Sequence, residues 1–272
     1  MEKEFIKLKK LLSRLKRNIL LKNYTTFRIG GPARYFFVAK NKEDLIEAIK
    51  MTKKTKLPFF ILGGGSNLLV SNKGFDGLVI KFGQPLSLYV SKGLEWAVGI
   101  PGTVQGAVCG NAGVFKKSMK DIVKSVEVFD TETEKIKVFK NKECKFGYRN
   151  SIFKKKKNLI ILSVKIKSKK SDTKKIKQYL DYRKKTQPLN LPSAGSVFKN
   201  PTGFSAARLI EECGLKGKKI GNAKISEKHA NFIVNLGNAK AKDVKKLINL
   251  IKKSVKNKFG IVLEEEIQFL GF

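Results

Sequence analysis

Cysteine and histidine are scarce in this chain of 272 residues. The three cysteines, Cys109, Cys144 and Cys213, show no CxxC spacing, and their odd number argues against a complete disulfide framework. The single histidine, His229, has no second ligand in view, so we interpret it as structural rather than metal-binding. The sequence therefore favours neither a disulfide scaffold nor a metal site.

Long apolar runs are also missing. The longer runs, such as PFFIL and LIIL, fall far short of the ~20 residues that span a bilayer. The N-terminal stretch MEKEFIKLKKLLSRLKR lacks the uninterrupted apolar core and the cleavage site of a signal peptide. We therefore expect a soluble, cytoplasmic protein without membrane insertion.

Acidic side chains are few: 22 Asp and Glu stand against 58 Lys and Arg, for a formal net charge of +36. Such a surplus is typical of proteins that neutralise phosphates. The lysines are dispersed, and the chain has neither a recognition motif nor a concentrated aromatic and basic patch, so a nucleic-acid-binding protein is the weakest interpretation. The surplus suits a polyanionic small molecule instead. Only seven of the basic residues are Arg, and their positions carry more information because Arg binds in a bidentate way that Lys cannot match.

The N-terminal part of the chain predicts alternating helices and strands. Apolar residues at helical spacing predict an amphipathic helix over residues 4–19. Strands are expected at 34–40 and 57–62, with a helix over 41–56 that Asn41 opens. This order is a βαβ unit, which favours a parallel pair of strands.

The rest of the chain predicts a β-rich region and then a separate α+β segment. Alternating residues at 125–130 and 134–140 indicate a hairpin, and 159–167 is a further expected strand. Pro188 and Pro192 mark a linker. Two helices are expected beyond it, at 204–215 and at 241–260, the second with a buried stripe of Val244, Leu247, Ile248, Ile251, Val255 and Phe259.

Two blocks rich in glycine and small residues stand out. The first is GGGSN, Gly63 to Asn67, directly after an expected strand, and the second is GIPGTVQGAVCGNAG, Gly99 to Gly113. Glycine lets the backbone turn tightly and present N–H groups to an anion. The first block matches neither the phosphate loop, which needs GK[ST], nor the dinucleotide fingerprint GxGxxG, and alone it would more often be a structural turn. Two such blocks could close on one extended ligand.

An ordered set of motifs resembles one family. The stretches YTTFRIGGPA, LGGGSNLLVS, GLEWAVGIPGT, GNAG, FGYRNSIF, SAGSVFKNP, ISEKHANFIVN and LEEEIQFLG, from Tyr24 to Gly271, resemble those of the UDP-N-acetylenolpyruvoylglucosamine reductases. A lone GGGSN is a weak match, but the ordered set is specific. No long insertion lies between Arg149 and Ser196, so the chain is similar to the shorter, second subclass, which lacks a loop with a substrate-clamping Tyr.

The resemblance implies an α+β fold. It implies an FAD-binding domain of the vanillyl-alcohol-oxidase (PCMH) type in two lobes, followed by a smaller α+β substrate-binding domain. The implied bounds are 1–80 for the first lobe, 81–187 for the second lobe, which is shortened near 82–92, and 188–272 for the substrate domain.

The implied activity is the NADPH-dependent, FAD-mediated reduction of UDP-N-acetyl-3-O-(1-carboxyvinyl)-glucosamine to UDP-N-acetylmuramate, a step in peptidoglycan precursor synthesis. A hydride reaches the terminal methylene carbon, so negative charge builds on the neighbouring carbon and its carboxylate. The resemblance assigns Arg149 to stabilising that charge, Ser196 to donating the proton and Glu266 to supporting the intermediate. The small residues around Ser196 would let the reacting carbon approach its hydroxyl. We expect a monomer that takes NADPH and a UDP-sugar enolpyruvyl ether.

Binding residues are implied in the same way. Tyr148, Lys199 and Asn200 are the expected substrate-binding residues. The expected FAD-binding residues lie mainly in the loops of small residues; they are Arg28, Gly30, Gly31, Gly63, Gly64, Gly65, Ser66, Asn67, Gly99, Pro101, Gly102, Thr103, Asn111, Ala112 and Gly113.

The chain also differs from the family pattern. Gln105, Lys116 and Asn222 stand where members commonly have glycine, and a side chain at a site of close approach can block a ligand or require an unfavourable dihedral angle. Glu265 and Gln268 stand where members often have Pro and Arg, which changes the charge around Glu266. Two interpretations therefore stay open beside the active reductase: a flavin-poor descendant that keeps the fold and, behind it, the basic nucleic-acid-binding protein.

Overall fold

The computed structural model describes residues 2–272, without the side chains of residues 2–5 and 7. The chain forms two compact units, each made of several segments. Unit 1 comprises residues 1–18, 35–64 and 77–180, and unit 2 comprises residues 19–34, 65–76 and 181–272. No helix among residues 2–272 is long and apolar enough to cross a membrane.

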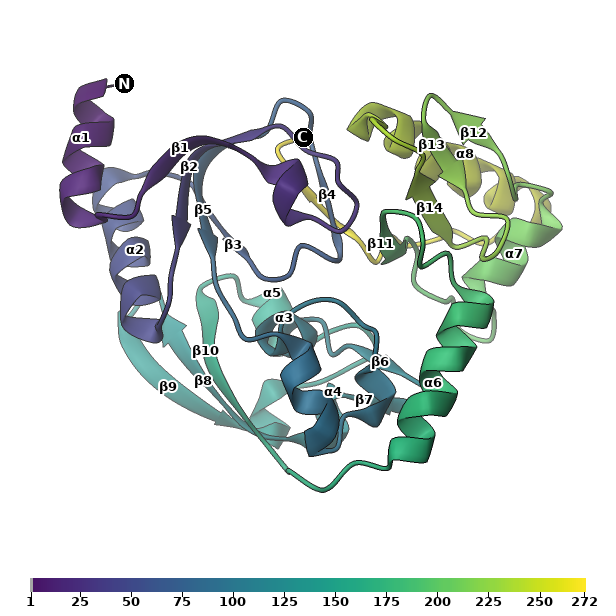
Figure 1. The fold of residues 1–272 in the computed structure, drawn as a ribbon, viewed down its shortest axis with the longest axis horizontal. Coiled ribbons are helices and arrows are strands. Elements are labelled where there is room, and N and C mark those ends of the chain that lie inside the picture. Colours follow the sequence, from purple (N-terminus) through teal and green to yellow (C-terminus); the bar gives the residue numbers. More distant parts are fainter. Residues whose placement is uncertain (1) are drawn as a thin grey trace. The chain divides into compact units, whose positions relative to one another are not determined.

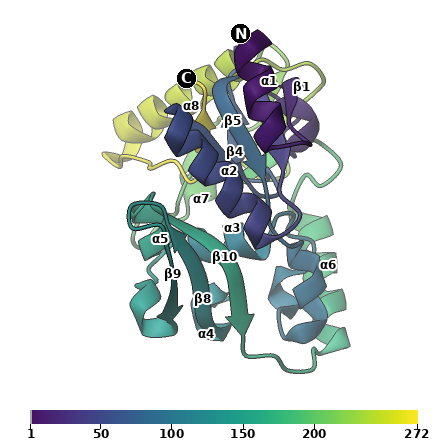
Figure 2. The same ribbon diagram turned by 90° about the vertical axis from the view of Figure 1, so that its left-hand side faces the viewer.

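Unit 1 begins with helix α1 (Glu2–Leu11) and contains a sheet whose strand order is β1-β2-β5-β3. Strands β3 and β5 are parallel, with Phe59 opposite Leu78. Figure 2 shows helix α2 lying in front of this sheet. The strands are β1 (Lys16–Leu20), β2 (Pro32–Val38), β3 (Phe59–Leu62) and β5 (Phe75–Lys81), and α2 runs from Lys42 to Thr55.

The predicted βαβ unit is present as β2-α2-β3. The side chain of Asn41 accepts a hydrogen bond from the N–H of Asp44, as expected of an N-cap residue. Lys56 ends the helix in a left-handed conformation, φ 53°. The buried face of α2, with Leu45 and Ile49, packs in the same core as Phe37. Strand β5 lies between β2 and β3, so the expected pair does not form direct neighbours.

The predicted helix over residues 4–19 is wrong in its second half. Helix α1 ends at Leu11, and residues from Lys16 to Leu20 form β1 beside β2. The apolar spacing is still used, because Leu8, Leu12 and Leu15 are buried in one core. Main-chain pairing at the sheet edge outweighs the helical preference of residues 16–20. The side chain of Phe5, the first member of the expected stripe, is outside the described part.

The second part of unit 1 is built on an antiparallel sheet of order β10-β8-β9. The predicted hairpin is confirmed as β8 and β9, with Asp130 opposite Lys135. Short elements pack around a separate core that contains Trp96, Met119 and Phe153. The elements are 3-10 helices at Leu86–Lys92, Glu95–Ala97 and Asn141–Cys144, α3 (Val104–Cys109), β6 (Gly113–Val114), β7 (Lys117–Ser118), α4 (Met119–Ile122), β8 (Val123–Asp130), β9 (Lys135–Lys140), α5 (Ile152–Lys155), β10 (Leu159–Ile166) and α6 (Thr173–Thr186).

Unit 2 contains an antiparallel sheet of order β11-β14-β13-β12, and helix α8 packs against it (Figure 1). The predicted stripe on α8 is buried, with Phe259 partly buried. Strands β4 and β15 form a parallel pair. The elements are a 3-10 helix at Leu21–Tyr24, β4 (Leu68–Val70), β11 (Ser193–Ser196), α7 (Ala206–Glu212), β12 (Lys219–Ile220), β13 (Ala223–Ile225), β14 (Phe232–Asn235), α8 (Ala241–Phe259) and β15 (Gln268–Leu270).

Two of the residues at expected glycine positions lie in hairpin turns. Phe115 and Lys116 join β6 to β7 with φ values of 53° and 58°, the pattern of a type I′ turn, which costs an L-residue roughly 1–2 kcal/mol. Gly221 takes the left-handed position in the turn before Asn222, at φ 55°. Asn222 therefore needs no strained dihedral angle, and Lys116 is an exposed side chain outside any close approach.

Candidate functional site

The two glycine-rich blocks meet within unit 1. A Cβ atom added to Gly64 would lie 2.3 Å from the Cα of Gly102, and one added to Gly63 would lie 2.7 Å from the Oγ1 of Thr103. Glycine is required at these positions because the two backbones approach closely. The hypothesis that the blocks are neighbours in space is thus supported by geometry.

The first block offers N–H groups to a ligand. In the described part of the chain, no oxygen accepts a hydrogen bond from the main-chain N–H of Gly63, Gly64, Gly65 or Ser66. Thr103 caps helix α3 through a hydrogen bond from the N–H of Gly106 to its Oγ1, 3.2 Å. Successive unpaired N–H groups in a tight loop suit a phosphate group. These residues fit the pyrophosphate of a dinucleotide such as FAD.

Gly30 and Gly31 have a packing role in unit 2. A Cβ on Gly31 would lie 2.1 Å from the carbonyl oxygen of Asn72, and one on Gly30 would lie 2.8 Å from the Cβ of Val70. The N–H of Gly31 donates to the carbonyl oxygen of Ser71, 2.8 Å. The missing side chains thus let the segment before β2 pack on the segment after β4.

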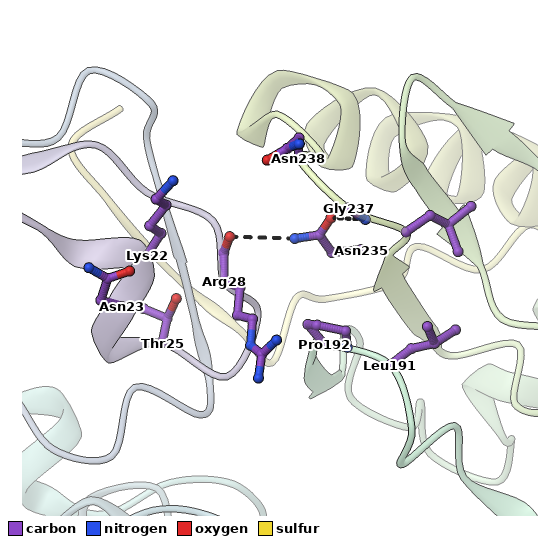
Figure 3. A pocket seen from close by; sticks show the side chains of 10 residues that line it. Lys22, Asn23, Thr25, Arg28, Leu191, Pro192, Asn235, Gly237 and Asn238 are labelled. Carbon is purple, nitrogen blue, oxygen red and sulfur yellow. Dashed lines mark hydrogen bonds between the residues drawn. The ribbon is translucent and has the colours of Figure 1, made fainter.

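Arg28 lies beside a cavity of about 620 Å³ in unit 2. Figure 3 shows its side chain between the Lys22–Thr25 segment and Pro192, with its carbonyl oxygen accepting from the side chain of Asn235. The ten lining residues include two cations and no carboxylate; they are Lys22, Asn23, Thr25, Arg28, Leu191, Pro192, Asn235, Leu236, Gly237 and Asn238. An anionic group of a ligand would suit this lining.

Arg149 occupies the tip of a tight turn in unit 1. Gly147 and Asn150 pair across the turn, so Tyr148 and Arg149 are its two loop residues. Arg149 has a φ of 51°, a strained conformation for a residue with a side chain. Its guanidinium carbon lies 5.3 Å from the centre of the Tyr148 ring. Strain that the surroundings maintain is a common mark of a functional residue.

Asn111, an expected cofactor residue, fastens this turn. It is buried, and its Nδ2 donates to the carbonyl oxygen of Gly147 at 2.8 Å while its Oδ1 accepts from the N–H of Lys120 at 3.0 Å. Ser151, also buried, donates from its hydroxyl to the carbonyl oxygen of Cys109, 2.7 Å. The second glycine-rich block and the turn with Arg149 are therefore bonded to each other.

Ser196 ends strand β11 in unit 2. The pairing of β11 with β14 shifts register between Ser193 and Ser196, and Gly195 between them has a φ of 76°. This irregularity is a bulge, which redirects the side chains beyond it. Ser196 is partly exposed, whereas the next residue, Val197, is buried.

Glu266 is held beside Ser196 through the main chain. Its N–H donates to the carbonyl oxygen of Val197 at 2.7 Å, and its own carbonyl oxygen accepts from the Nδ2 of Asn67 at 3.0 Å. The neighbouring Glu265 pairs with Lys252 at 2.9 Å. The two departures from the family pattern that lie close to Glu266 in sequence thus have different outcomes: Glu265 forms an ion pair with Lys252, and Gln268 begins β15.

The expected substrate residues are distributed over both units. Lys199 in unit 2 forms an ion pair with Glu264. Asn200 accepts a hydrogen bond from the N–H of Ala206 at the start of α7, 3.0 Å. Tyr148 is exposed at the turn in unit 1. Of the expected catalytic residues, Ser196 and Glu266 are neighbours in unit 2, whereas Arg149 belongs to unit 1.

Two residues important for these segments were missed from the sequence. Buried Asn231 bonds to the main chain just after Ser196, and buried Gln105 bonds to strand β10 and to the segment after β5 in unit 1. The available signal is weak. An Asn before the apolar run FIV indicates only the beginning of a strand, and Gln105 is predicted to be an obstacle rather than a bonding residue.

The remaining candidates are His229, which is partly buried, and the three cysteines, of which only Cys144 is fully buried. The Nδ1 of His229 has no hydrogen-bond partner among the described residues, and burial lowers the pKa of this imidazole. The three cysteines are free, and burial raises the pKa of Cys144 to about 11. No group of three or more His, Cys, Asp or Glu side chains within residues 2–272 could hold a metal ion.

Comparison with known proteins identifies the family. Residues 187–270 match the model of the UDP-N-acetylenolpyruvoylglucosamine reductase C-terminal domain, and residues 33–91 match an FAD binding domain. The reductase of Caldanaerobacter subterraneus subsp. tengcongensis is 43% identical over 97% of this chain and 97% of its own length. That of Caldicellulosiruptor saccharolyticus is 44% identical over 92% and 90%.

A solved structure agrees with this result. The crystal structure of the UDP-N-acetylenolpyruvylglucosamine reductase from Thermus caldophilus has a TM-score of 0.81 and 37% sequence identity, and the match covers 95% of this chain and 99% of that one. The predicted α+β fold with an FAD-binding domain is confirmed. The alignment with the Caldanaerobacter relative has 295 positions, more than the 272 residues here, so this chain lacks residues that the relative has. The chain belongs to the UDP-N-acetylenolpyruvoylglucosamine reductase family.

Proposed function

We propose that this protein reduces UDP-N-acetyl-3-O-(1-carboxyvinyl)-glucosamine to UDP-N-acetylmuramate with NADPH, a step in building peptidoglycan precursors for the cell wall. The observation that carries the proposal is the 43% identity, over almost the whole chain, with a reductase of that name. The motifs around Arg149, Ser196 and Glu266 lie within the aligned family and supply side chains of the right chemistry.

FAD is the cofactor of the proposed reaction, and it supplies hydride transfer between NADPH and the substrate. Support comes from the FAD-binding domain match at 33–91 and from the meeting of the two glycine-rich blocks. The N–H groups of Gly63 to Ser66 would bind the pyrophosphate. Gly99, Pro101, Gly102 and Thr103 would line the other side, with Ala112 and Gly113 nearby in the chain.

The protein's own side chains would act on the charge and on the proton. Arg149 would stabilise negative charge on the substrate carboxylate and the adjacent carbon through two parallel hydrogen bonds. Ser196 would donate its hydroxyl proton to that carbon, and Glu266 would help to stabilise the developing charge. A Ser hydroxyl is a poor acid in water, so it must be positioned accurately and its proton replaced from a neighbour.

The organisation of the protein follows from this function. We assign 1–80 and 81–187 to the two lobes that bind FAD and 188–272 to the substrate. Tyr148, Lys199 and Asn200 would contact the UDP-sugar, for which a strongly basic chain is suited. We further propose a cytoplasmic monomer that binds no specific nucleic acid.

Two measurements test the proposal. The purified protein should show the absorbance of bound flavin, or acquire it on incubation with FAD and desalting. Under anaerobic conditions, more than one equivalent of NADPH per bound flavin should then be consumed only when the enolpyruvyl substrate is present. A protein that stays colourless after incubation with FAD would support the flavin-poor descendant, and a protein that binds FAD but never consumes NADPH would refute the proposed reaction.

A further inference from the structure

The segment from Ser196 to Lys199 is paired on both sides in unit 2. On one side, the carbonyl oxygen of Val197 accepts from the N–H of Glu266, and the N–H of Lys199 donates to the carbonyl oxygen of Glu264, 2.9 Å. Phe198 lies opposite Glu265 in this short antiparallel contact. Ser196, the proposed proton donor, and Glu266, the proposed supporting carboxylate, thus lie on adjacent segments that are hydrogen-bonded to each other.

Asn231 supplies the pairing on the other side. Its main-chain oxygen accepts from the N–H of Val197 at 2.8 Å. Its side chain bonds to both polar groups of Phe198: Oδ1 accepts from the N–H at 2.9 Å, and Nδ2 donates to the carbonyl oxygen at 2.8 Å. With only 4% of its surface exposed, Asn231 acts as one residue of an added strand beyond the end of the β11–β14 pairing.

Asn67 holds Glu266 from the opposite direction. Its Nδ2 donates to the carbonyl oxygen of Glu266 at 3.0 Å, and its carbonyl oxygen accepts from the N–H of Gln268 at 3.0 Å. The parallel pairing of β4 with β15 begins at the next residues, Leu68 and Gln268. Asn67 is the last residue of the GGGSN block, but its side-chain amide bonds to the main chain of Glu266.

We propose that Asn67 positions Glu266 through its side-chain amide. The motif instead predicts that Asn67 is an FAD ligand. This inference rests on the proposed function of Glu266 and Ser196. The N–H of Glu266 is fixed by Val197 and its carbonyl oxygen by Asn67, so both polar groups on its main chain are held. Removing the amide frees one of these groups and lets the carboxylate move relative to Ser196.

The expected effect is confined to one half of the reaction. Reduction of bound flavin by NADPH needs neither the proton from Ser196 nor the carboxylate of Glu266. Transfer to the enolpyruvyl substrate needs both. A misplacement on the order of 1 Å in a catalytic group can reduce a rate about 100-fold, so the loss should appear only in the second half-reaction.

The experiment compares Asn67→Ala with a matched control, Asn72→Ala. Asn72 also bonds to a main-chain group of unit 2, with its Oδ1 accepting from the N–H of Ala241 at 2.7 Å. FAD affinity is measured by quenching of flavin fluorescence, and each half-reaction is measured by anaerobic stopped-flow absorbance. Circular dichroism checks folding, and Asn67→Gln, which keeps the amide but displaces it, replaces Asn67→Ala if the latter does not fold.

For Asn67→Ala we expect an FAD affinity and a flavin reduction rate within about threefold of wild type, and a substrate half-reaction slowed about 10- to 100-fold. Asn231→Ala should show the same selective loss, and Asn72→Ala should not. An Asn67→Ala protein whose FAD affinity falls at least tenfold while the substrate half-reaction stays intact at saturating FAD overturns the proposal. Equal slowing of both halves overturns it as well. A wild-type protein without any substrate half-reaction would instead refute the proposed function.

Discussion

At the scale of single residues, the left-handed backbone of Arg149 is the strongest local sign of function. A side chain in that region costs roughly 1–2 kcal/mol, and a glycine at this turn would avoid the cost. Asn111 and the pair formed by Gly147 and Asn150 maintain the turn. The surrounding hydrogen bonds thus hold Arg149 in a backbone conformation that is unfavourable for a residue with a side chain.

The first prediction concerns Arg149→Lys. It retains the charge, but a point charge cannot reproduce two parallel hydrogen bonds to a carboxylate. We expect a fall of at least about 100-fold in the rate of the substrate half-reaction, as for the loss of one preorganised donor. Stopped-flow absorbance measures it. Near-normal turnover would make Arg149 a structural clamp.

The second prediction concerns Ser196→Ala. Flavin reduction by NADPH should continue, because hydride transfer from nicotinamide needs no proton from this hydroxyl. Product formation should fall about 10²–10⁴-fold, the usual contribution of a general acid. Single-turnover measurements separate the two steps. If both slow equally, the hydroxyl positions the loop after Gly195 and the proton comes from another group.

The third prediction concerns His229 and pH. Burial lowers the pKa of this imidazole below its ordinary 6.5, so in the window below 6.5 the unfolded chain binds more protons than the folded one. Its contribution to stability is therefore lost as the pH falls through that window. Urea unfolding at several pH values should show a smaller loss for His229→Gln than for wild type. Parallel stability curves would show that His229 does not titrate differently on folding.

At the scale of elements, the hydrogen bonds of Gln105 show why a side chain is accommodated where the family commonly has glycine. Its Oε1 accepts from the N–H of Gln84 at 3.0 Å, and its Nε2 donates to the carbonyl oxygen of Leu162 at 3.3 Å. Leu162 lies at the register shift in the β10–β8 pairing. The buried amide therefore joins helix α3, an irregular point of β10 and the segment after β5, and it is not an obstacle at the surface of a loop.

The same segment supports the second glycine-rich block. Pro85 pairs with Thr103, the N–H of Leu86 donates to the carbonyl oxygen of Gly102 at 3.0 Å, and the N–H of Val104 donates to the carbonyl oxygen of Gln84 at 2.9 Å. The stretch of residues 82–92 thus packs on the loop proposed to bind FAD. Gln105 fixes the point at which that stretch begins.

The fourth prediction concerns Gln105→Gly, which restores the residue that is common in the family. We expect a loss of about 2–4 kcal/mol in the free energy of unfolding, since two hydrogen bonds are removed and glycine is unfavourable in a helix. Urea denaturation of the FAD-free protein measures it, with Asn222→Gly as the control in an exposed turn. A Gln105→Gly variant as stable as wild type would show that its bonds are replaced by water.

The spacing of apolar residues predicted the helices and strands that have a strong local pattern. It failed where pairing with a segment distant in sequence determines the structure. The α8 stripe and the β8–β9 hairpin follow directly from their residue patterns. The pattern of residues 4–19 could not show that residues 16–20 would join a sheet edge. Helix α6, with a buried Arg183, was not predicted, because its sequence has a weak apolar face.

The motifs proposed which residues make up the candidate site, but they could not predict the hydrogen bonds that hold these residues. The motifs located Arg149, Ser196 and Glu266 in the chain, but they did not indicate which polar groups hold those residues. Asn67 and Asn111 were expected to bind the cofactor, and their amides bond to the segments of Glu266 and Arg149. These bonds join residues far apart in sequence, so a motif reading cannot find them.

At the scale of the whole molecule, the surplus of Lys should produce only loose attraction to nucleic acids. The charge is dispersed, so binding should depend on counterion release and weaken steeply with salt. Filter binding with RNA and DNA at increasing salt tests this fifth prediction. Sequence-selective binding that persists at high salt would restore the nucleic-acid-binding interpretation.

The central claim is that a chain shortened relative to its relatives still carries out the whole reductase reaction. Mass spectrometry of the product, after anaerobic incubation with FAD, NADPH and UDP-N-acetyl-3-O-(1-carboxyvinyl)-glucosamine, tests it most directly. The account predicts a product heavier than the substrate by two hydrogen atoms, formed only when NADPH is present and formed about 10²–10⁴-fold more slowly by Ser196→Ala. Unchanged substrate in the presence of saturating FAD and NADPH would contradict it.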